Sequence, residues 1–299
     1  TPLSVHSREI HYFDFNKPQM SEHLWMYEGI TEYFANLFQV NQGLISEEDF
    51  YKRMNGKIEE ANAMNDKMSF TKMSKNVLEQ PYKEQYLNVY QKGALIAMCI
   101  DIQMRELSNG QRGILSLMQD LSNEFGSNKP FKDEELFATI TRITYPQIGE
   151  FLNTYVAGET PIPYEVFFAK MGVTKGKTIA TGNPFLKDGS TPLITVDGAT
   201  KQIKALEDVS NNIFMTSLGI QGNDVLKAFN DKEYNLDNIY DLIMSSESWK
   251  DGDAISVTVI RDGKELVLKG KINLPKEEKS GFMATDKTKE TIKNAWLKG

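Results

Sequence analysis

The chain has 299 residues, of which 40% are hydrophobic and 25% charged, and this composition is typical of a globular protein of one or two domains. Its formal net charge is −7, and basic residues are interspersed with acidic ones, so we expect no nucleic-acid partner and no anionic membrane surface as a target. No apolar run approaches the roughly 18 residues that a membrane-spanning helix needs, so we expect no membrane span.

The single cysteine, Cys99, lies in an apolar run and has no partner for an internal disulfide. This pattern fits a reducing compartment and equally a secreted protein without disulfides. The chain begins with Thr and shows no signal-peptide pattern, so we expect it to be a piece of a longer protein. The sequence does not predict a compartment, whether cytoplasmic, periplasmic or secreted.

The first part of the chain has the spacing of helices up to about residue 170. The segment that follows Ser21 places apolar residues three and four apart, which predicts one buried stripe: Tyr27, Ile30, Phe34, Leu37 and Phe38. Ser21 and Ser46 are placed to cap helices, since a hydroxyl can accept a free first-turn N–H. Residues 90–107 are apolar nearly all round, which predicts a buried helix. Shorter helices are expected over 113–126, 131–143 and 147–158.

After Gly172 the pattern changes to short, β-branched, alternating runs separated by Asp-Gly turns. We expect strands within 191–198, 253–263 and 264–272, and the last two form a hairpin around Asp262-Gly263. A short amphipathic helix is expected over 235–246. The sequence therefore predicts an α+β chain with a helical domain over 1–171, a β-rich domain over 172–275, and a C-terminal helix or loose tail over 276–299.

The residues that most often carry catalysis do not form a familiar pattern. His6, His11 and His23 contain no His-x-x-x-His pair, and the chain has no Gly-x-Ser-x-Gly elbow and no phosphate loop. Cys99 sits in the middle of an apolar helix, where a thiol is normally an inert core residue. Carboxylates and tyrosines remain as candidates.

Glu28 and Glu32 lie one turn apart, off the apolar stripe of their helix, and from this pattern alone both are solvated acids. Tyr90, just ahead of Lys92-Gly93 and the buried helix, is by pattern alone a core or boundary tyrosine. The periodicity does not distinguish either acid as a functional group.

Three stretches resemble a known family: "LWMYEGITEYFANLFQVNQGLISEEDF" from Leu24, "YQKGALIAMCIDIQMRE" from Tyr90, and "GEFLNTYVAGETPIPYEVFFAKMGV" from Gly149. In this order they are similar to the second half of a gluzincin zinc peptidase domain, with a thermolysin-like fold, in the glycyl aminopeptidase family. Members of that family carry a PDZ domain after the catalytic one. The resemblance implies a zinc-dependent aminopeptidase whose substrate is a peptide.

The same resemblance assigns roles to two residues. Glu28, in Trp25-x-x-Glu28-Gly29, matches the family's third zinc ligand, and Tyr90 matches the tyrosine whose hydroxyl stabilises the developing oxyanion. Gly93 is expected to let two backbones pass closely, and no role is carried onto Glu32. The family's His-Glu-x-x-His helix, which supplies two zinc ligands and the general base, lies shortly before the point where this chain begins. We therefore expect the chain alone to bind no zinc tightly and to be inactive.

The segment from Leu218 to Ile272 resembles a PDZ domain, with Gly219-Ile220, Asp224 and the hairpin at Asp262-Gly263 in matching positions. Asn223 replaces a family glycine and tolerates positive φ. PDZ domains bind extended peptides at a sheet edge, but no carboxylate-binding loop is evident between Gly172 and Asn212, so the peptide-binding residues are unknown. The alternative function is thus a non-catalytic protein that captures a peptide or protein partner through this domain, or whose PDZ-like domain only packs against the helical one. Substrate preference is not predicted.

Overall fold

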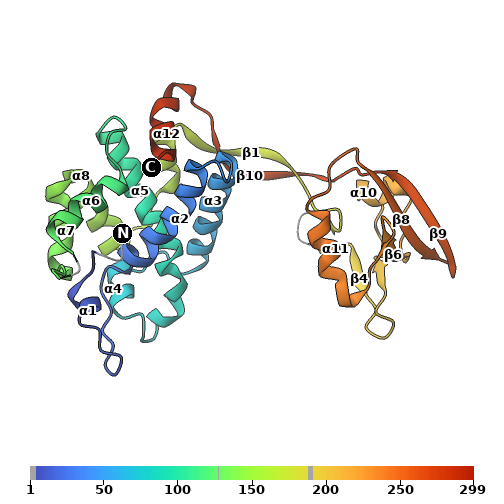
Figure 1. Cartoon of the computed structure of the whole chain (residues 1–299), viewed down its shortest axis with the longest axis horizontal. Helices are drawn as coiled ribbons and strands as arrows, with labels where there is room; N and C mark the ends of the chain where they lie inside the picture. The colour runs from blue at the N-terminus through green and yellow to red at the C-terminus, as the bar shows by residue number, and fades with distance from the viewer. Residues whose placement is uncertain (1–4, 127, 188–190) are drawn as a thin grey trace. The chain divides into compact units, whose positions relative to one another are not determined.

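The computed structural model describes residues 5–126, 128–187 and 191–299, and the chain divides into two compact units (Figure 1). Unit 1 runs to Gly176 and resumes at Gly281–Gly299, while unit 2 is Lys177–Ser280. The sequence pattern placed the first boundary at 171, five residues earlier. The C-terminal segment is part of the helical unit, so unit 2 is an insertion between two stretches of unit 1.

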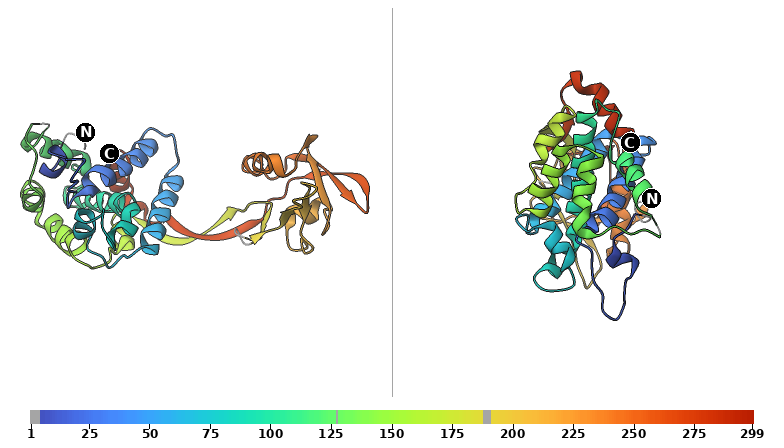
Figure 2. Two further views of the ribbon diagram at one scale, coloured as in Figure 1. Left: turned by 90° about the horizontal axis from the view of Figure 1, so that it is seen from below. Right: turned by 90° about the vertical axis from the view of Figure 1, so that its left-hand side faces the viewer.

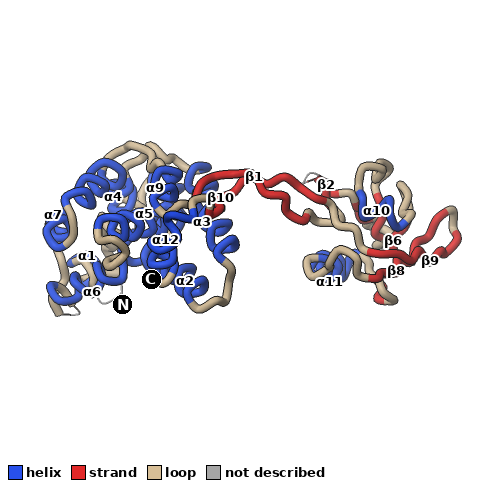
Figure 3. Tube along the Cα trace, turned by 90° about the horizontal axis from the view of Figure 1, so that it is seen from above, coloured by secondary structure: helices blue, strands red, loops and turns tan. Residues whose placement is uncertain are grey.

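Unit 1 is built almost entirely of helices (Figure 3). They are α1 (Arg8–His11), η2 (Trp25–Gly29), α2 (Ile30–Asn41), α3 (Glu47–Ala63), α4 (Phe70–Lys75), η3 (Tyr82–Val89), α5 (Gln91–Leu107), α6 (Ile114–Glu124), α7 (Asp133–Ile143), α8 (Pro146–Phe151), η4 (Leu152–Ala157), α9 (Tyr164–Lys170), η6 (Lys287–Lys289) and α12 (Glu290–Leu297). Of these, η2 and η4 are π-helical and η3 and η6 are 3₁₀ turns. Ser46 caps α3 as expected: its hydroxyl accepts the Asp49 N–H at 3.0 Å.

Helix α5 is the centre of unit 1. It is buried on every face over most of its length, as its uniformly apolar sequence predicted, and it packs against α2, α3, α6, α8, α9 and α12. A helix without a polar face can only be stable when other elements cover it all round. The surrounding amphipathic helices supply that cover with their own apolar stripes. The described helices include none that combines the length and apolar composition a transmembrane span requires.

Buried polar side chains form a hydrogen-bond network within this core. Asp101 of α5 is fully buried, and its carboxylate accepts the Tyr33 hydroxyl at 2.7 Å and the Ile114 N–H at 2.9 Å. The Tyr33 oxygen in turn accepts the indole N–H of Trp296 at 2.8 Å. Burial raises the pKa of Asp101, and the Arg105 guanidinium, with Nε 3.5 Å from Oδ1, offsets part of that cost. Helices α2, α5, α6 and α12 are thereby joined at one point.

The C-terminal helix α12 belongs to the unit 1 core rather than to a loose tail (Figures 1 and 2). Trp296 is fully buried, and its ring lies 5.6 Å from that of Phe50, 6.2 Å from Tyr51 and 6.0 Å from Phe168 between centroids. Aromatic rings at these separations contribute beyond the area they bury. The last helix of the chain therefore completes the core that the first helices begin.

Unit 2 is β-rich, and the whole chain is α+β as expected. Its main sheet runs β4 (Ile194–Val196), β5 (Ile203–Ala205), β6 (Val225–Phe229), β8 (Ala254–Arg261) and β9 (Lys264–Lys271), all antiparallel, with β7 (Lys232–Glu233) pairing with β6. Helices α10 (Ile213–Leu218) and α11 (Ile239–Ser246) and the 3₁₀ turn η5 (Leu236–Asn238) complete it. The short strands β2 (Leu186–Lys187) and β3 (Thr191–Pro192) pair with each other, as do β1 (Val173–Thr181) and β10 (Lys276–Ala284).

The motif residues of unit 2 have structural roles. Asp262 and Gly263 both have positive φ, 49° and 73°, as the two-residue turn of the β8–β9 hairpin requires. Asn223 also has positive φ, 69°, so it occupies the glycine position without changing the turn. Asp224, almost fully buried, accepts two hydrogen bonds from Arg261, at 2.8 and 2.7 Å. A bidentate, partly buried pair of this kind holds the loop after α10 against strand β8.

Because Trp296 fills the core and satisfies Tyr33, we expect Trp296→Ala to lower the free energy of unfolding of unit 1 by about 3–5 kcal/mol. Lys298→Ala, at an exposed position two residues later, should change it by less than about 0.5 kcal/mol. Urea unfolding followed by far-UV circular dichroism at the helical band measures both. Equal stability of the two variants would contradict a core role for α12.

Candidate active site

The candidate site is organised around a close crossing of two backbones. Gly29, at the end of η2, lies against Gly93 in the first turn of α5: a Cβ built on Gly29 would stand 2.4 Å from the carbonyl carbon of Gly93. A Cβ on Gly93 would lie 3.0 Å from the Gly29 Cα and 3.4 Å from the Trp25 Cα. Only glycine at both positions allows the helices to approach this closely. The close passage expected at Gly93 is thus present, and Gly29 is its partner.

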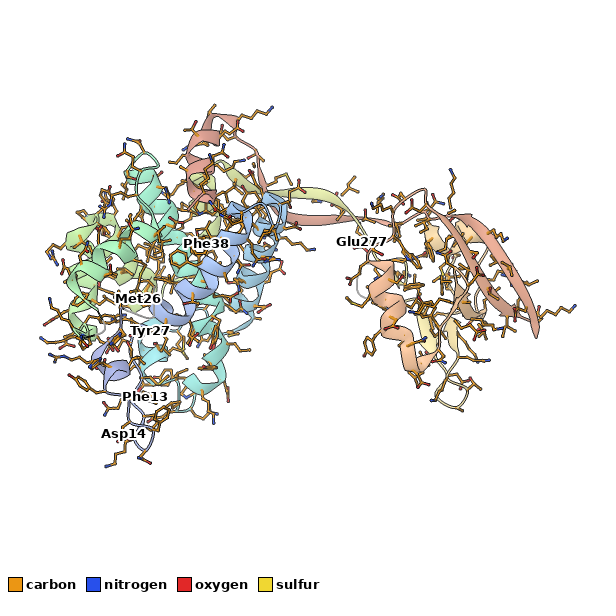
Figure 4. All side chains as sticks on the ribbon, in the orientation of Figure 1. Phe13, Asp14, Met26, Tyr27, Phe38 and Glu277 are labelled. Carbon is orange, nitrogen blue, oxygen red and sulfur yellow. The ribbon has the colours of Figure 1, made fainter. Side chains whose placement is uncertain are left out.

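This crossing brings the two predicted site residues together. Glu28 immediately precedes Gly29, and Tyr90 lies one helical turn before Gly93, so both side chains come from the crossing itself. The negative charge of Glu28 contributes to raising the pKa of the Tyr90 hydroxyl, after the hydrogen bond with Tyr86 and partial burial. Both side chains are half-buried, whereas Met26 and Tyr27, the residues before Glu28, lie in the interior of unit 1 (Figure 4).

The segment that carries Glu28 is a π-helix rather than the regular α-helix that the spacing predicted. The Ile30 N–H bonds the Trp25 carbonyl five residues earlier, which widens the turn at Trp25–Gly29 before α2 continues. Single π turns are rare in proteins, and those that do occur are often found at functional sites. The wide turn keeps Trp25, Met26 and Tyr27 in the core and leaves the Glu28 side chain half-exposed.

A second set of contacts fixes the start of this π turn. The carboxylate of Asp133, the first residue of α7, accepts the Ser21 hydroxyl at 2.8 Å and the Glu22 N–H at 2.7 Å. Ser21 also accepts the His23 N–H at 3.0 Å, but the helix has Leu24 as its N-cap and no side-chain cap bond, so the expected capping role of Ser21 is wrong. The His23 ring, buried and with its pKa lowered by that burial, lies 3.0 Å from the Asp133 carbonyl oxygen. Burial raises the pKa of Asp133. No pattern in the sequence pointed to Asp133.

The Tyr90 hydroxyl is held in its protonated form. The hydroxyls of Tyr86 and Tyr90 are 3.5 Å apart, and this hydrogen bond, partial burial and the Glu28 carboxylate together raise the pKa of Tyr90 well above its ordinary value. A phenol with a raised pKa keeps its proton at neutral and mildly alkaline pH. Tyr90 is therefore available as a hydrogen-bond donor to a group that approaches Glu28.

The base of the Tyr90 turn is fixed by Lys92, whose side chain is 2% exposed. Its ammonium group donates to the Asp66 carboxylate at 2.9 Å and to the Asp66 carbonyl at 3.0 Å. A buried lysine is stable only when its charge is paired and hydrogen-bonded in this way. The pair ties the first turn of α5 to the loop after α3, and the spacing of the sequence did not reveal the partner.

The remaining candidates do not gather around Glu28. Cys99 is fully buried and burial raises the pKa of its thiol, which fits the core role expected of it. His6 and His11 are half-buried and lie against each other, Nε2 to Nδ1 at 2.9 Å. In the described parts of the chain no three His, Cys, Asp or Glu side chains form a group that could hold a metal. Glu28 is therefore a single carboxylate, and the described residues by themselves do not make up a zinc site.

Two comparisons show what this chain is similar to. Residues 4–96, which contain Glu28, Tyr90 and Gly93, match the M61 glycyl aminopeptidase family, so the resemblance in the motifs is confirmed for this part of the chain. The fold is similar to the crystal structure of an aminopeptidase N family protein from Idiomarina loihiensis, with a TM-score of 0.57 and 18% sequence identity.

That likeness covers 98% of this chain and 52% of the Idiomarina protein, so the chain spans about half the length of the structure it matches. At 18% identity the likeness shows the fold alone. No match was found among curated proteins.

The glycine crossing makes a direct prediction. Gly29→Ala places a methyl group against the Gly93 backbone, which cannot move aside as a flexible side chain can, so we expect the free energy of unfolding to fall by about 3 kcal/mol. Gly56→Ala is the matched control: Gly56 lies inside α3 with nothing within 4 Å of a built Cβ. It should stabilise the protein by about 0.5–1 kcal/mol through helix propensity alone. Chemical denaturation measures both, and a neutral Gly29→Ala would refute the crossing.

Proposed function

We propose that this chain is the C-terminal part of a zinc-dependent aminopeptidase that hydrolyses the N-terminal residue of peptides with a metal-activated water. The observation that supports it is the placement of Glu28 and Tyr90 beside the Gly29–Gly93 crossing, where the charge of Glu28 contributes to raising the pKa of Tyr90. This pair lies inside the region that matches the M61 glycyl aminopeptidase family. A half-exposed carboxylate next to a protonated phenol combines a ligand for a metal with a donor for a developing negative charge.

In this proposal Glu28 supplies one zinc ligand. The resemblance to the glycyl aminopeptidase family implies that the other two ligands and the general base would come from a His-Glu-x-x-His helix of the longer protein; the described residues contain no group of three His, Cys, Asp or Glu that could hold a metal. Tyr90 donates its O–H to the oxygen of the scissile carbonyl as negative charge develops on it. Its raised pKa keeps that proton in place, and the π turn and the Lys92–Asp66 pair hold the two groups at their positions.

The 299-residue chain alone should therefore retain no stoichiometric zinc and cleave no peptide, because one carboxylate is a weak and exchangeable ligand. Metal analysis of the purified chain after dialysis against zinc, with a fluorogenic aminopeptidase assay, measures both. One equivalent of zinc that disappears in Glu28→Gln would show that the chain completes the metal site by itself and would overturn this part of the proposal.

In a protein that includes the preceding segment, Glu28→Gln should abolish zinc binding and activity together. Tyr90→Phe should retain zinc and lower kcat by about 10²–10³-fold, the usual cost of removing one oxyanion donor. Tyr240→Phe, which removes a hydroxyl from a largely exposed tyrosine of unit 2, is the control and should change neither quantity. Normal turnover in Tyr90→Phe would remove Tyr90 from the mechanism.

The alternative is a protein that binds peptides or a partner through unit 2, as a PDZ-like domain, without catalysis. Two features favour it: β4 stands at one end of the main sheet, and the neighbouring surface of α11 exposes Tyr240 and Met244 one turn apart, 79% and 65% accessible. An extended peptide could add to such an edge strand. The residues upstream of Thr1 in the native gene decide between the two functions, because the absence of His-Glu-x-x-His there would exclude the enzyme.

A further inference from the structure

Glu32 lies in a polar cluster that joins the Glu28 helix to the residue next to Tyr90. It follows Glu28 by one helical turn, and its Oε1 accepts the Lys57 ammonium group at 2.7 Å. Lys57, from α3, also donates to the Gln91 side-chain oxygen at 3.1 Å. Gln91 directly follows Tyr90 at the start of α5. The cluster therefore lies at the same helix crossing as the candidate site.

The contacts of Glu32 leave part of its carboxylate open to solvent. The Lys57 side chain is 12% exposed and the Glu32 side chain 36% exposed. The Asn36 amide also donates to Oε1, at 3.3 Å, so the hydrogen bonds that described side chains make with this carboxylate go to one oxygen. Lys57 and Asn36 thus fix the orientation of Glu32 while its other oxygen, Oε2, remains available to a positively charged ligand.

We propose that Glu32 binds the free α-ammonium group of the substrate and so selects peptides with an unblocked N-terminus. This inference rests on the proposed aminopeptidase function. In a peptide the α-nitrogen lies about 2.5 Å from the carbonyl carbon of the same residue. A charge-assisted hydrogen bond from that ammonium to a carboxylate adds about 2.8 Å.

These lengths are comparable to one helical turn, and Glu32 follows Glu28 by four residues. Side chains at positions i and i+4 of a helix have Cβ atoms about 5–6 Å apart. A substrate whose scissile carbonyl lies at the Glu28–Tyr90 pair therefore places its ammonium group within reach of Glu32. A substrate with an acetylated N-terminus offers no charge and a bulkier group, so it loses this contact.

The competing explanation is a purely structural ion pair between α2 and α3. Such a pair at a half-exposed position contributes little and acts through packing of the two helices. Loss of a purely structural pair would change the kinetics of charged and blocked substrates by the same factor. Loss of a carboxylate that binds the ammonium group would weaken binding of the charged substrate alone. Kinetics with charged and blocked substrates therefore separate the two roles.

The test uses the enzyme expressed from its native gene, with glycyl-7-amido-4-methylcoumarin and its N-acetyl form as substrates. We expect Glu32→Gln to raise KM for the free-amine substrate about 10- to 100-fold, the range for a lost hydrogen bond to a charged group, with kcat changed less than about threefold. The preference for the free amine over the acetylated substrate should fall by a similar factor. Glu32→Asp, which keeps the charge on a shorter side chain, should give an intermediate KM.

Lys57→Met is the matched control because it breaks the ion pair and leaves the Glu32 charge in place. Because Lys57 also orients Glu32, this variant should raise KM for the free amine by less than Glu32→Gln does and should retain most of the preference for the free amine. If Glu32→Gln fails to fold, the double variant Glu32→Gln/Lys57→Met removes both charges together and should show the same raised KM.

Each remaining outcome overturns a defined claim. If the wild-type enzyme hydrolyses neither substrate nor any other peptide, the proposed function fails and this inference falls with it. If the wild-type enzyme is active but Glu32→Gln keeps its KM and its preference, the function stands and Glu32 does not bind the ammonium group. A loss in Lys57→Met as large as that in Glu32→Gln would likewise show that Glu32 acts only through the ion pair.

Discussion

The contact of Gly29 with Gly93 is the constraint on which the candidate site depends. Two helices that meet backbone to backbone bring the residues beside the contact closer than helices separated by side chains can. Glu28 and Tyr90 are those residues; both side chains are half-buried, and the charge of Glu28 contributes to raising the pKa of Tyr90. The π turn adjusts the direction of Glu28 without disturbing the buried residues on either side of it.

Several charged side chains, paired or hydrogen-bonded, hold the elements around this crossing. Asp133 fixes the chain ahead of the π turn, and Lys92 with Asp66 fixes the first turn of α5. Lys57 then links α3 to α2 and to Gln91. In each case one partner is well buried, so the charge is expensive to leave unpaired and the geometry is correspondingly specific. A site whose groups must lie within a few tenths of an ångström benefits from supports of this kind.

The C-terminal helix α12 returns the chain to unit 1 after unit 2. Trp296 donates to Tyr33, which donates to the buried Asp101, so the last turn of the chain satisfies a polar network that the first helices begin. The aromatic rings around Trp296 add apolar burial to these hydrogen bonds. Residues that follow the β-rich unit in the chain therefore complete the core of the helical unit. For this reason unit 2 is an insertion between two stretches of unit 1.

Apolar spacing and turn residues predicted the kinds of element and much of their placement along the chain. Apolar spacing fixed the amphipathic helix with Glu28 and Glu32 on one side, the uniformly buried helix α5, and the β8–β9 hairpin, because these depend on periods of a few residues and on local turn conformations. The family motifs singled out Glu28 and Tyr90, which periodicity alone could not distinguish from a solvated acid and a core tyrosine.

Which of these residues are in contact could be seen only in the tertiary structure. The glycine contact, the pairing of Lys92 with Asp66 and of Lys57 with Glu32 and Gln91, and the return of Trp296 to Tyr33 each join residues that are far apart in the chain. The spacing of the sequence did not predict the π turn at Glu28 for the same reason. The extra residue of this turn is stabilised by packing against α5 and not by the local sequence. Local propensities cannot encode such contacts, because their free energy arises only when the helices are already packed together.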